Sequence, residues 1–146
     1  MACGAAYTVR SAVWASDEAA IFAVRRSVFV DEQHVDPQLE WDGRDAGCFH
    51  VLACDIAGRA VGTGRLLQDG HIGRMAVLPD WRGRGVGGDL LSALIEEARR
   101  RYLTAVHLNA QLHAKGFYRR AGFRVAGREF MEAGILHCAM RLELEH

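Results

Sequence analysis

The chain has 146 residues, of which half are apolar and 25% are charged, so it can bury one hydrophobic core and is not disordered. Eighteen basic side chains balance eighteen acidic ones. This neutrality argues against sequence-independent binding of nucleic acid or anionic membranes, which requires accumulated positive charge. No stretch approaches the roughly 18 consecutive apolar residues of a membrane span, and no secretory signal is recognisable. We therefore expect a single cytoplasmic domain that binds neither nucleic acid nor membranes.

The four cysteines form no C-x-x-C pair, and their spacing is too irregular for a zinc ribbon: Cys3, Cys48, Cys54 and Cys138. We expect them to be small, mostly buried side chains in a reducing cytosol. The last residues, Leu144 to His146, resemble the start of a vector-encoded polyhistidine tail. This places the domain at residues 1–143.

In the first half of the chain, the apolar pattern predicts a strand over 7–14 and a helix that Ser16 caps and that ends near Phe29. An acidic, mostly polar segment follows over 31–45. Irregular segments of this length commonly cover a site or become ordered on binding. Short turns then separate three predicted strands, over 49–55, 60–67 and 72–78.

In the second half, residues 86–101 predict a strongly amphipathic helix that ends in three arginines, the charge that its dipole favours. A strand over 103–109 and a short helix over 112–121 follow. Two further strands, over 123–130 and 138–144, complete the chain. This order indicates a mixed α/β fold without internal repeats.

The segment 75–88 leads a strand into a glycine-rich turn and then into a helix N-terminus. Such a turn leaves convergent N–H groups at the positive end of the helix dipole, and Arg82 and Arg84 add cationic donors suited to a pyrophosphate. A Walker loop is excluded because no Gly-Lys-Ser/Thr follows. The turn satisfies G-x-G-x-x-G literally, but its surroundings do not fit a dinucleotide fold. A surface turn without a ligand is the other alternative.

Three separated motifs resemble the GCN5-related N-acetyltransferase (GNAT) family. Residues 77–87, Val-x-Pro-x-x-Arg-Gly-x-Gly-x-Gly, resemble its pyrophosphate motif, which is Arg/Gln-x-x-Gly-x-Gly/Ala after a strand. Residues 114–123 resemble a later segment, A-x-x-aromatic-Y-x-x-x-G-F. Residues 28–33, together with 40–45 and His50, are similar to the bacterial subgroup typified by ElaA and YjcF. The resemblance therefore covers nearly the whole chain.

The resemblance implies an α/β GNAT fold, with a central twisted mixed sheet of six to seven strands and about four flanking helices. It also implies an N-acetyltransferase in which a primary amine of a small molecule or peptide attacks acetyl-CoA directly within a ternary complex. No metal and no covalent enzyme intermediate is then needed, so Cys54 and Cys138 are not required as nucleophiles. Dimers are common in the family, and the final strand is a candidate edge for a homodimer.

For the coenzyme, the resemblance implies backbone contacts from Met75, Ala76 and Val77 to the pantetheine arm, with the Val77 amide donating to the oxyanion. The expected phosphate cradle comprises Arg82, Gly83, Arg84, Gly85, Val86 and Gly87. Further coenzyme contacts are expected from Asn109, Gln111, Phe117 and Tyr118. Asn109 could instead cap the following helix, and Gln111 stands where many relatives have asparagine.

For proton transfer, Tyr118 occupies the family's general-acid position, and a phenol of ordinary pKa about 10 can donate at neutral pH. Without the resemblance, it would be interpreted as a packed aromatic residue. The attacking amine must lose a proton. Glu32 is the preferred base, with Glu40, His71 and His137 as alternatives.

Other functions remain as alternatives. A non-catalytic acyl-CoA sensor would keep the cradle without needing Tyr118, and dinucleotide-dependent redox chemistry predicts stabilisation by NAD(H). A metal could use the acidic cluster, although its spacing matches no calcium loop: Asp31, Glu32, His34, Asp36, Asp42 and Asp45. An acidic lip would equally attract a cationic small molecule or a peptide amine.

Overall fold

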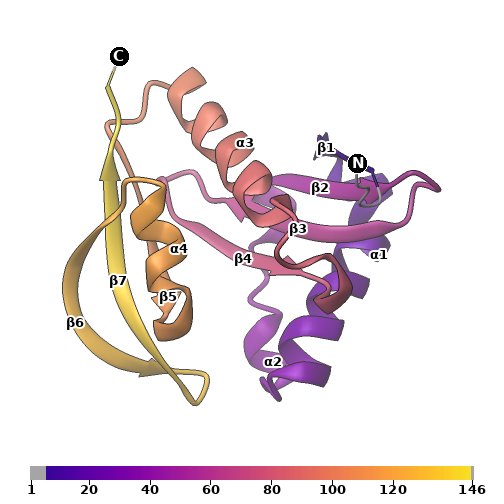
Figure 1. The fold of residues 1–146 in the computed structure, drawn as a ribbon, viewed down its shortest axis with the longest axis horizontal. Helices are drawn as coiled ribbons and strands as arrows, with labels where there is room; N and C mark the ends of the chain where they lie inside the picture. The colour runs from indigo at the N-terminus through magenta and orange to yellow at the C-terminus, as the bar shows by residue number, and fades with distance from the viewer. Residues whose placement is uncertain (1–5, 146) are drawn as a thin grey trace.

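The computed structural model describes residues 6–145, in which strands and helices alternate along the chain (Figure 1). The strands are β1 (Tyr7–Ala12), β2 (Phe49–Asp55), β3 (Ala60–Leu66), β4 (Ile72–Val77), β5 (Ala105–Gln111), β6 (Arg124–Glu132) and β7 (Ile135–Glu143). The α-helices are α1 (Trp14–Arg25), α2 (Pro37–Glu40), α3 (Val86–Arg100) and α4 (Lys115–Arg120). The mixed α/β class is confirmed.

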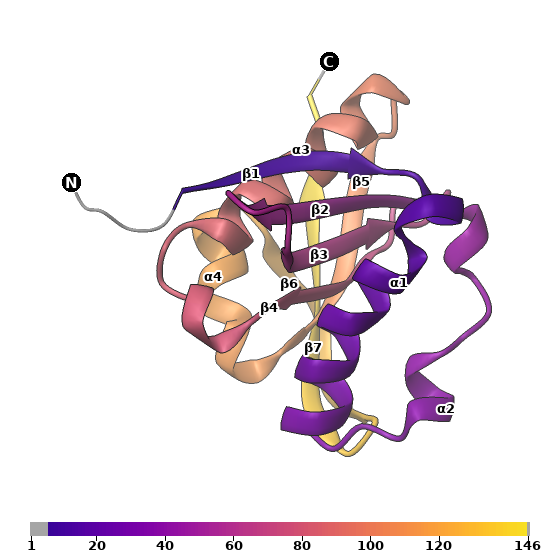
Figure 2. The same ribbon diagram turned by 90° about the vertical axis from the view of Figure 1, so that its right-hand side faces the viewer.

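The strands form two sheets, ordered β1-β2-β3-β4 and β5-β7-β6, in which the neighbours pair antiparallel. The sheets meet at a parallel bridge between His71 and His107, just before β4 and within β5. In Figure 2, the strands of the second sheet run crosswise to those of the first. The expected central sheet is thus divided between β4 and β5, and this separation leaves backbone groups of β4 unpaired on one side.

Helices cover both faces of the four-stranded sheet, with α1 in front of it and α3 behind it in Figure 2. The apolar stripe of α1 and its continuation packs Ile21 against Leu52, and Val24 and Val28 against Ala76. The apolar face of α3, anticipated from its period, is buried: Val86, Leu90, Leu91, Leu94, Ile95 and Ala98. A Cβ atom on Gly62 would lie 2.9 Å from Leu90 Cδ1. Because β3 has glycine there, α3 packs closely enough to place its N-terminus beside the end of β4.

The first helix differs from the expectation at both ends. Ser16 lies inside α1 and does not cap it; the N–H of Val13 instead donates to the Asp17 carboxylate at 2.8 Å. Beyond α1, the chain continues as a π-helical segment over Arg26–Glu32, past the expected end at Phe29. π-Helical turns are rare in proteins overall. Those that do occur are often found at functional sites. The extension brings Glu32 to the edge of the cleft described below.

The polar segment 31–45 is more ordered than its composition indicated. It contains α2, whose first turn is capped by Asp36 accepting from the Gln38 N–H at 2.9 Å. A single 3₁₀ turn, Asp45–Gly47, leads from it into β2.

Smaller differences concern the end of the chain. The helix expected over 112–121 begins as a 3₁₀ turn before α4, and the last strand begins at Ile135. Leu144 is buried in the main core, and its N–H donates to the Thr104 carbonyl at 2.9 Å. Leu144 thus packs with the domain, and the expected boundary at 143 stays a prediction. Cys3 and His146 lie outside the described residues.

Candidate active site

A cleft of about 700 Å³ opens where the two sheets separate. Its walls come from β4, from β5 and the β6–β7 hairpin, from the π-helical segment and from residues of the 31–45 segment. The cleft therefore brings together the motifs that lie far apart in the sequence. Most of the expected site residues line it or border it: Glu32, Met75, Ala76, Val77, Arg82, Asn109, Gln111 and Tyr118.

Strand β4 presents backbone donors to this cleft. The N–H of Leu78 donates to the Val61 carbonyl at 2.9 Å, and Val77 lies opposite Gly62. Because residues in an antiparallel pair alternate between bonded and unbonded positions, the amides of Val77 and Met75 point away from β3. Ala76 pairs with Thr63 and packs its side chain against α1, and it also lines the cleft. The outward amide of Val77 is free to meet developing negative charge.

A bulge bends β4 just before these donors. The β3–β4 register shifts between Thr63 and Arg65, so that Gly64 faces more than one residue of β4. Arg74 lies in this bulge with a φ of 49°, a left-handed conformation that is uncommon for a side-chain-bearing residue. Its guanidinium donates to the backbone carbonyls of Leu39 (3.2 Å) and Glu40 (2.9 Å). The bulge thereby connects β4 to the 31–45 segment.

The glycine-rich turn has the features of an anion cradle. Gly83 and Gly85 have φ angles of 75° and 91°, and Gly85 is the N-cap of α3. The first hydrogen bond within α3 runs from the Asp89 N–H to the Gly85 carbonyl. The N–H groups of Val86, Gly87 and Gly88 come before this bond and therefore have no acceptor within the helix. A Cβ atom on Gly87 would lie 3.4 Å from the Phe117 ring, so glycine permits α4 to approach here. These donors at the positive end of α3 suit a pyrophosphate.

The two arginines of the turn have different partners. Arg82 donates through Nε to the Val77 carbonyl at 2.9 Å and forms a two-pronged ion pair with Glu32 at 2.7 and 2.8 Å. Arg84 instead lies over the Trp81 ring, with its guanidinium 5.0 Å from the ring centroid. The hydrogen bonds from Arg82 lower the pKa of the Glu32 carboxyl. A carboxylate held in this way is a weaker proton acceptor, which disfavours the expected role of Glu32 as the base.

Tyr118 lines the cleft from α4, and its ring is packed edge-on against Phe117 and Phe123, with centroids 5.0 and 5.8 Å away. Its side chain is only 9% exposed. Burial raises the pKa of Tyr118 to about 12, because it disfavours the phenolate. The hydroxyl therefore stays protonated at any physiological pH, as a general acid requires.

Polar residues of the second sheet form the opposite wall. Gln111 exchanges two hydrogen bonds with Gln33, at 2.8 and 3.2 Å, and so joins β5 to the π-helical segment. Asn109 does not cap the following helix; its amide lies 3.5 Å from the Glu132 carboxylate. His137 bonds through Nδ1 to the Ile135 carbonyl at 2.7 Å. Since a carbonyl only accepts, Nδ1 carries a proton, and Nε2 lies 3.8 Å from a Glu132 carboxylate oxygen.

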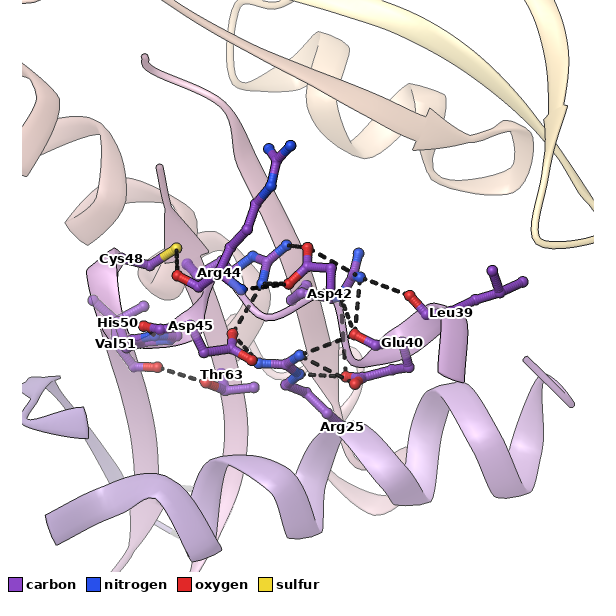
Figure 3. Close-up of polar contacts among 12 residues, drawn as sticks. Arg25, Leu39, Glu40, Asp42, Arg44, Asp45, Cys48, His50, Val51 and Thr63 are labelled. Atoms are coloured by element: carbon purple, nitrogen blue, oxygen red, sulfur yellow. Dashed lines mark hydrogen bonds and ion pairs between the residues drawn. The ribbon is translucent and has the colours of Figure 1, made fainter. Parts of the chain in front are cut away.

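Below the cleft, the acidic residues of the 31–45 segment form a buried network with arginines, shown in Figure 3. Arg25 binds Glu40 and, at 2.7 Å, Asp45. Arg65 binds Asp42 and, at 2.9 Å, Asp45. These carboxylates are therefore already paired with arginines, and only Asp42 among the three keeps a partly exposed side chain. Glu40 is no longer available as a free base for the same reason.

The remaining titratable candidates are placed as follows. His71 lines the cleft, 5.0 Å from the His107 ring, and burial lowers its pKa, with a further decrease from His107. Cys54 and Cys138 are buried and Cys48 is half-buried; all three are free thiols. Among residues 6–145, no group of three or more His, Cys, Asp or Glu side chains is arranged to hold a metal ion. None of the helices described is long and apolar enough to cross a membrane.

The sequence did not reveal three residues that shape this site: Arg25, Arg65 and Arg74. A signal for the first existed, because Arg25 stands on the same helical stripe as Ile21 and Val28, where a charge requires a buried partner. Arg65 likewise interrupts an otherwise buried strand. Their partners lie in a segment too irregular for its contacts to be inferred from spacing.

Comparison with known proteins agrees with this geometry. A family model described as an acetyltransferase (GNAT) domain matches residues 13–144. YyaT of Bacillus subtilis (strain 168) is 37% identical over 127 residues, which cover 83% of this chain and 85% of YyaT. YjcF of the same organism, named as an N-acetyltransferase, is 38% identical over 123 residues, covering 82% of this chain and 87% of YjcF.

Solved structures share the fold over nearly its whole length. Escherichia coli ElaA matches with a TM-score of 0.83 and 28% identity, covering 94% of this chain and 100% of ElaA. An acyl-CoA N-acyltransferase from Pseudomonas aeruginosa matches with a TM-score of 0.81 and 30% identity, covering 94% of this chain and 99% of that one.

A divided sheet with unpaired donors on one strand, beside a glycine turn at a helix N-terminus, defines an acyltransferase that uses an acyl-CoA cosubstrate. The chain belongs to the GNAT acetyltransferase family. The resemblance to ElaA and YjcF inferred from the sequence is confirmed.

Proposed function

We propose that the protein is an N-acetyltransferase that uses acetyl-CoA to acetylate a primary amine by direct attack in a ternary complex. The observation that carries the proposal is the presence, around one cleft, of the outward amide of Val77 and the buried, protonated Tyr118. The N-acetyltransferase name of YjcF supports the same reaction.

The residues around the cleft fit a coenzyme with a diphosphate and an extended arm. The N–H groups of Val86, Gly87 and Gly88 would receive phosphate oxygens, with Arg84 adjacent. The amides of Met75 and Val77 would receive the amide-rich arm, as a neighbouring strand would. When bound, acetyl-CoA supplies an acetyl group activated as a thioester.

Two proton transfers complete the reaction. Tyr118 Oη donates a proton to the departing sulfur, which its raised pKa permits throughout the neutral range. His137 Nε2 accepts the proton that the amine loses on forming the new C–N bond, because its Nδ1 is fixed by Ile135. We prefer His137 to Glu32 as the base, since Arg82 already occupies the carboxylate of Glu32.

A thermal-shift comparison tests the coenzyme assignment. Acetyl-CoA and free CoA are expected to raise the melting temperature in a concentration-dependent way, since they bind only the native state, whereas NADH should not. Release of free thiol across a panel of primary amines then tests the transfer. A melting temperature indifferent to both CoA forms would overturn the assignment. Stabilisation by acetyl-CoA without thiol release from any amine would indicate a sensor rather than an enzyme.

A further inference from the structure

One wall of the cleft is formed by arginines. Arg44 from the 31–45 segment, Arg65 from β3 and Arg74 from β4 all line the cavity, and we call these three residues the cationic wall. Arg65 is almost fully buried, whereas a quarter of the Arg74 side chain is exposed. Figure 3 shows Arg44 extending away from the buried network. Arg44 and Arg74 are therefore the members of this wall that a ligand can reach.

The donors beneath the cleft outnumber their acceptors. Three guanidinium groups, those of Arg25, Arg65 and Arg74, face three carboxylates, those of Glu40, Asp42 and Asp45. Within residues 6–145, Arg74 Nη1 has no hydrogen-bond acceptor, and Arg65 Nε is buried without one. The Arg44 guanidinium, which extends away from this network, has no acceptor among these residues either. The three ion-paired arginines are thus matched in charge, and Arg44 adds a cation without a carboxylate partner.

Arg74 is the cation that the surroundings compensate least. Burial lowers its pKa and the nearby Arg65 lowers it further, against the opposing effect of Asp42. Arg65 is also penalised by burial, but its hydrogen bonds to Asp42 and Asp45 raise its pKa overall. Arg74 moreover keeps a left-handed backbone at the bulge, a conformation that costs free energy for any residue except glycine. The strain at Arg74, its unpaired Nη1 and the unpartnered Arg44 guanidinium on the same wall indicate that a ligand supplies further acceptors.

We propose that the acceptor is an amine that also carries an oxyanion, a carboxylate or a phosphate, and that this group binds Arg74 and Arg44. Both kinds of oxyanion present paired oxygens that match the two-pronged geometry of a guanidinium. The inference names the acceptor class for the proposed acetyl transfer and therefore depends on it. It also replaces the expectation of an acidic lip that attracts a purely cationic acceptor.

The positions of the groups suit a small bifunctional acceptor. Arg74 lies three residues before Val77 on β4, which is at most about 10 Å along a strand. A long guanidinium side chain shortens this separation, so an amine at Val77 and an oxyanion at Arg74 can belong to one compact molecule. On the opposite wall, Glu132 lies beside Asn109 and His137 and adds attraction for the ammonium end.

Matched substrates test the proposal. Thiol release from acetyl-CoA is measured with ω-amino acids of increasing chain length, with alkylamines of the same lengths, and with aminoalkyl phosphates. We expect the best oxyanion-bearing amine to have a kcat/KM on the order of 10- to 100-fold above its neutral counterpart, the range for a charge-assisted hydrogen bond. Comparison of the carboxylate and phosphate series distinguishes the two oxyanions. Equal rates for charged and neutral counterparts at every length would overturn the proposal.

Variants identify the residues responsible. Arg44→Gln removes a side chain without partners in the described chain, so the variant should fold normally. The ratio of kcat/KM for the oxyanion-bearing amine to that for its neutral counterpart should fall toward one. Arg74→Gly removes the second guanidinium and is compatible with the left-handed φ, although it also releases the Leu39 and Glu40 carbonyls. Arg59→Gln, in the exposed β2–β3 turn, is the matched control and should keep the full preference. A preference that persists in both Arg44→Gln and Arg74→Gly contradicts the assignment.

Direct binding separates this inference from the proposed function. If no amine releases thiol, titration calorimetry with CoA present compares the same ω-amino acids with their alkylamine counterparts. Selective binding of the charged series that Arg44→Gln weakens would support the oxyanion site although the acetyl transfer had failed. Binding of neither series, or of both equally, would overturn the oxyanion site itself.

Discussion

Tyr118 shows how burial adapts a single side chain to a chemical role. The ring is enclosed by Phe117 and Phe123, and the residue lines the cleft. The resulting pKa of about 12 reflects desolvation, with no nearby charge needed to produce it. A phenol in this environment stays protonated and can donate its hydrogen bond and proton to the sulfur as negative charge develops there, but it does not ionise on its own.

Tyr118→Phe should lower kcat by about 100-fold or more, the typical contribution of a positioned general acid. The affinity for acetyl-CoA should stay within a small factor, because the phenyl ring keeps its packing. In the wild type, the rate should show no loss from Tyr118 ionisation below pH 11, since the pKa lies near 12. Steady-state kinetics and calorimetric titration of acetyl-CoA check both statements. Tyr102→Phe, at an exposed position, is the control. Unchanged turnover in Tyr118→Phe would remove Tyr118 from the mechanism.

At the scale of elements, the 31–45 segment owes its position to buried ion pairs. It has a single short helix and few apolar contacts, yet Glu40 and Asp45 are almost fully buried against Arg25. Burial tends to raise the pKa of Asp45, but the hydrogen bonds from Arg25 and Arg65 outweigh it and the pKa lies below its usual range. The segment and the cationic wall are therefore held in place through α1.

Arg25→Met should destabilise the fold by about 3–5 kcal/mol at pH 7, because it removes the main partner of the buried Glu40 carboxylate and one of the two guanidinium partners of Asp45. In the wild type, the lowered pKa of Asp45 gives stability that is present above pH 4 and is lost as the pH falls below it. In the variant, the buried carboxyl of Asp45 has lost the charge of Arg25, which favours its protonated form. The loss in free energy of unfolding relative to the wild type should therefore shrink as the pH falls toward 4. Urea unfolding at both pH values measures this.

The control for this prediction is Arg10→Met, which removes the ion pair of Arg10 with Asp17. Half of the Arg10 side chain is exposed, and surface pairs contribute about 0–1 kcal/mol. A loss in Arg25→Met no larger than that in Arg10→Met would show that the network does not anchor the segment.

At the scale of the whole molecule, the junction of the two sheets determines whether a cleft exists. Among residues 6–145, the backbone pairing between the two sheets consists of the bridge between His71 and His107 and the bond from the His107 N–H to the Gly70 carbonyl at 3.1 Å, just before β4 begins. Past this point, β4 has no neighbour on its outer side. Donors that a continuous sheet would satisfy internally are thus left for a ligand.

Gly70→Ala tests the junction. Gly70 has a φ of 95°, and an added Cβ would lie 2.8 Å from the Ala105 carbonyl oxygen. The left-handed conformation should cost about 1–2 kcal/mol for alanine, and the backbone clash about 1–3 kcal/mol more. Gly58→Ala is the matched control, with a φ of 86° and open space around the added carbon. Equal losses in the free energy of unfolding for the two variants would show that the sheets adapt freely at Gly70.

The sequence by itself determined the features that depend on near neighbours in the chain. The period of α3, the turn that begins it and the aromatic pair at 117–118 follow from local spacing, and so does the order of the strands along the chain. These features were enough to indicate the family, because its motifs are short and contiguous. The boundaries at Ser16 and Phe29 were less accurate, since capping and π-helical continuation depend on contacts that spacing does not show.

Only the tertiary structure decided which charges meet. The acidic residues at 40–45 suggested a cationic acceptor when considered alone, but the fold places Arg25, Arg65 and Arg74 against them and neutralises them. Glu32 likewise pairs with Arg82, 50 residues away, and the hydrogen bonds from Arg82 lower the pKa of its carboxyl. The physical reason is that electrostatic energy depends on distance and burial in space, and separation along the chain does not fix either.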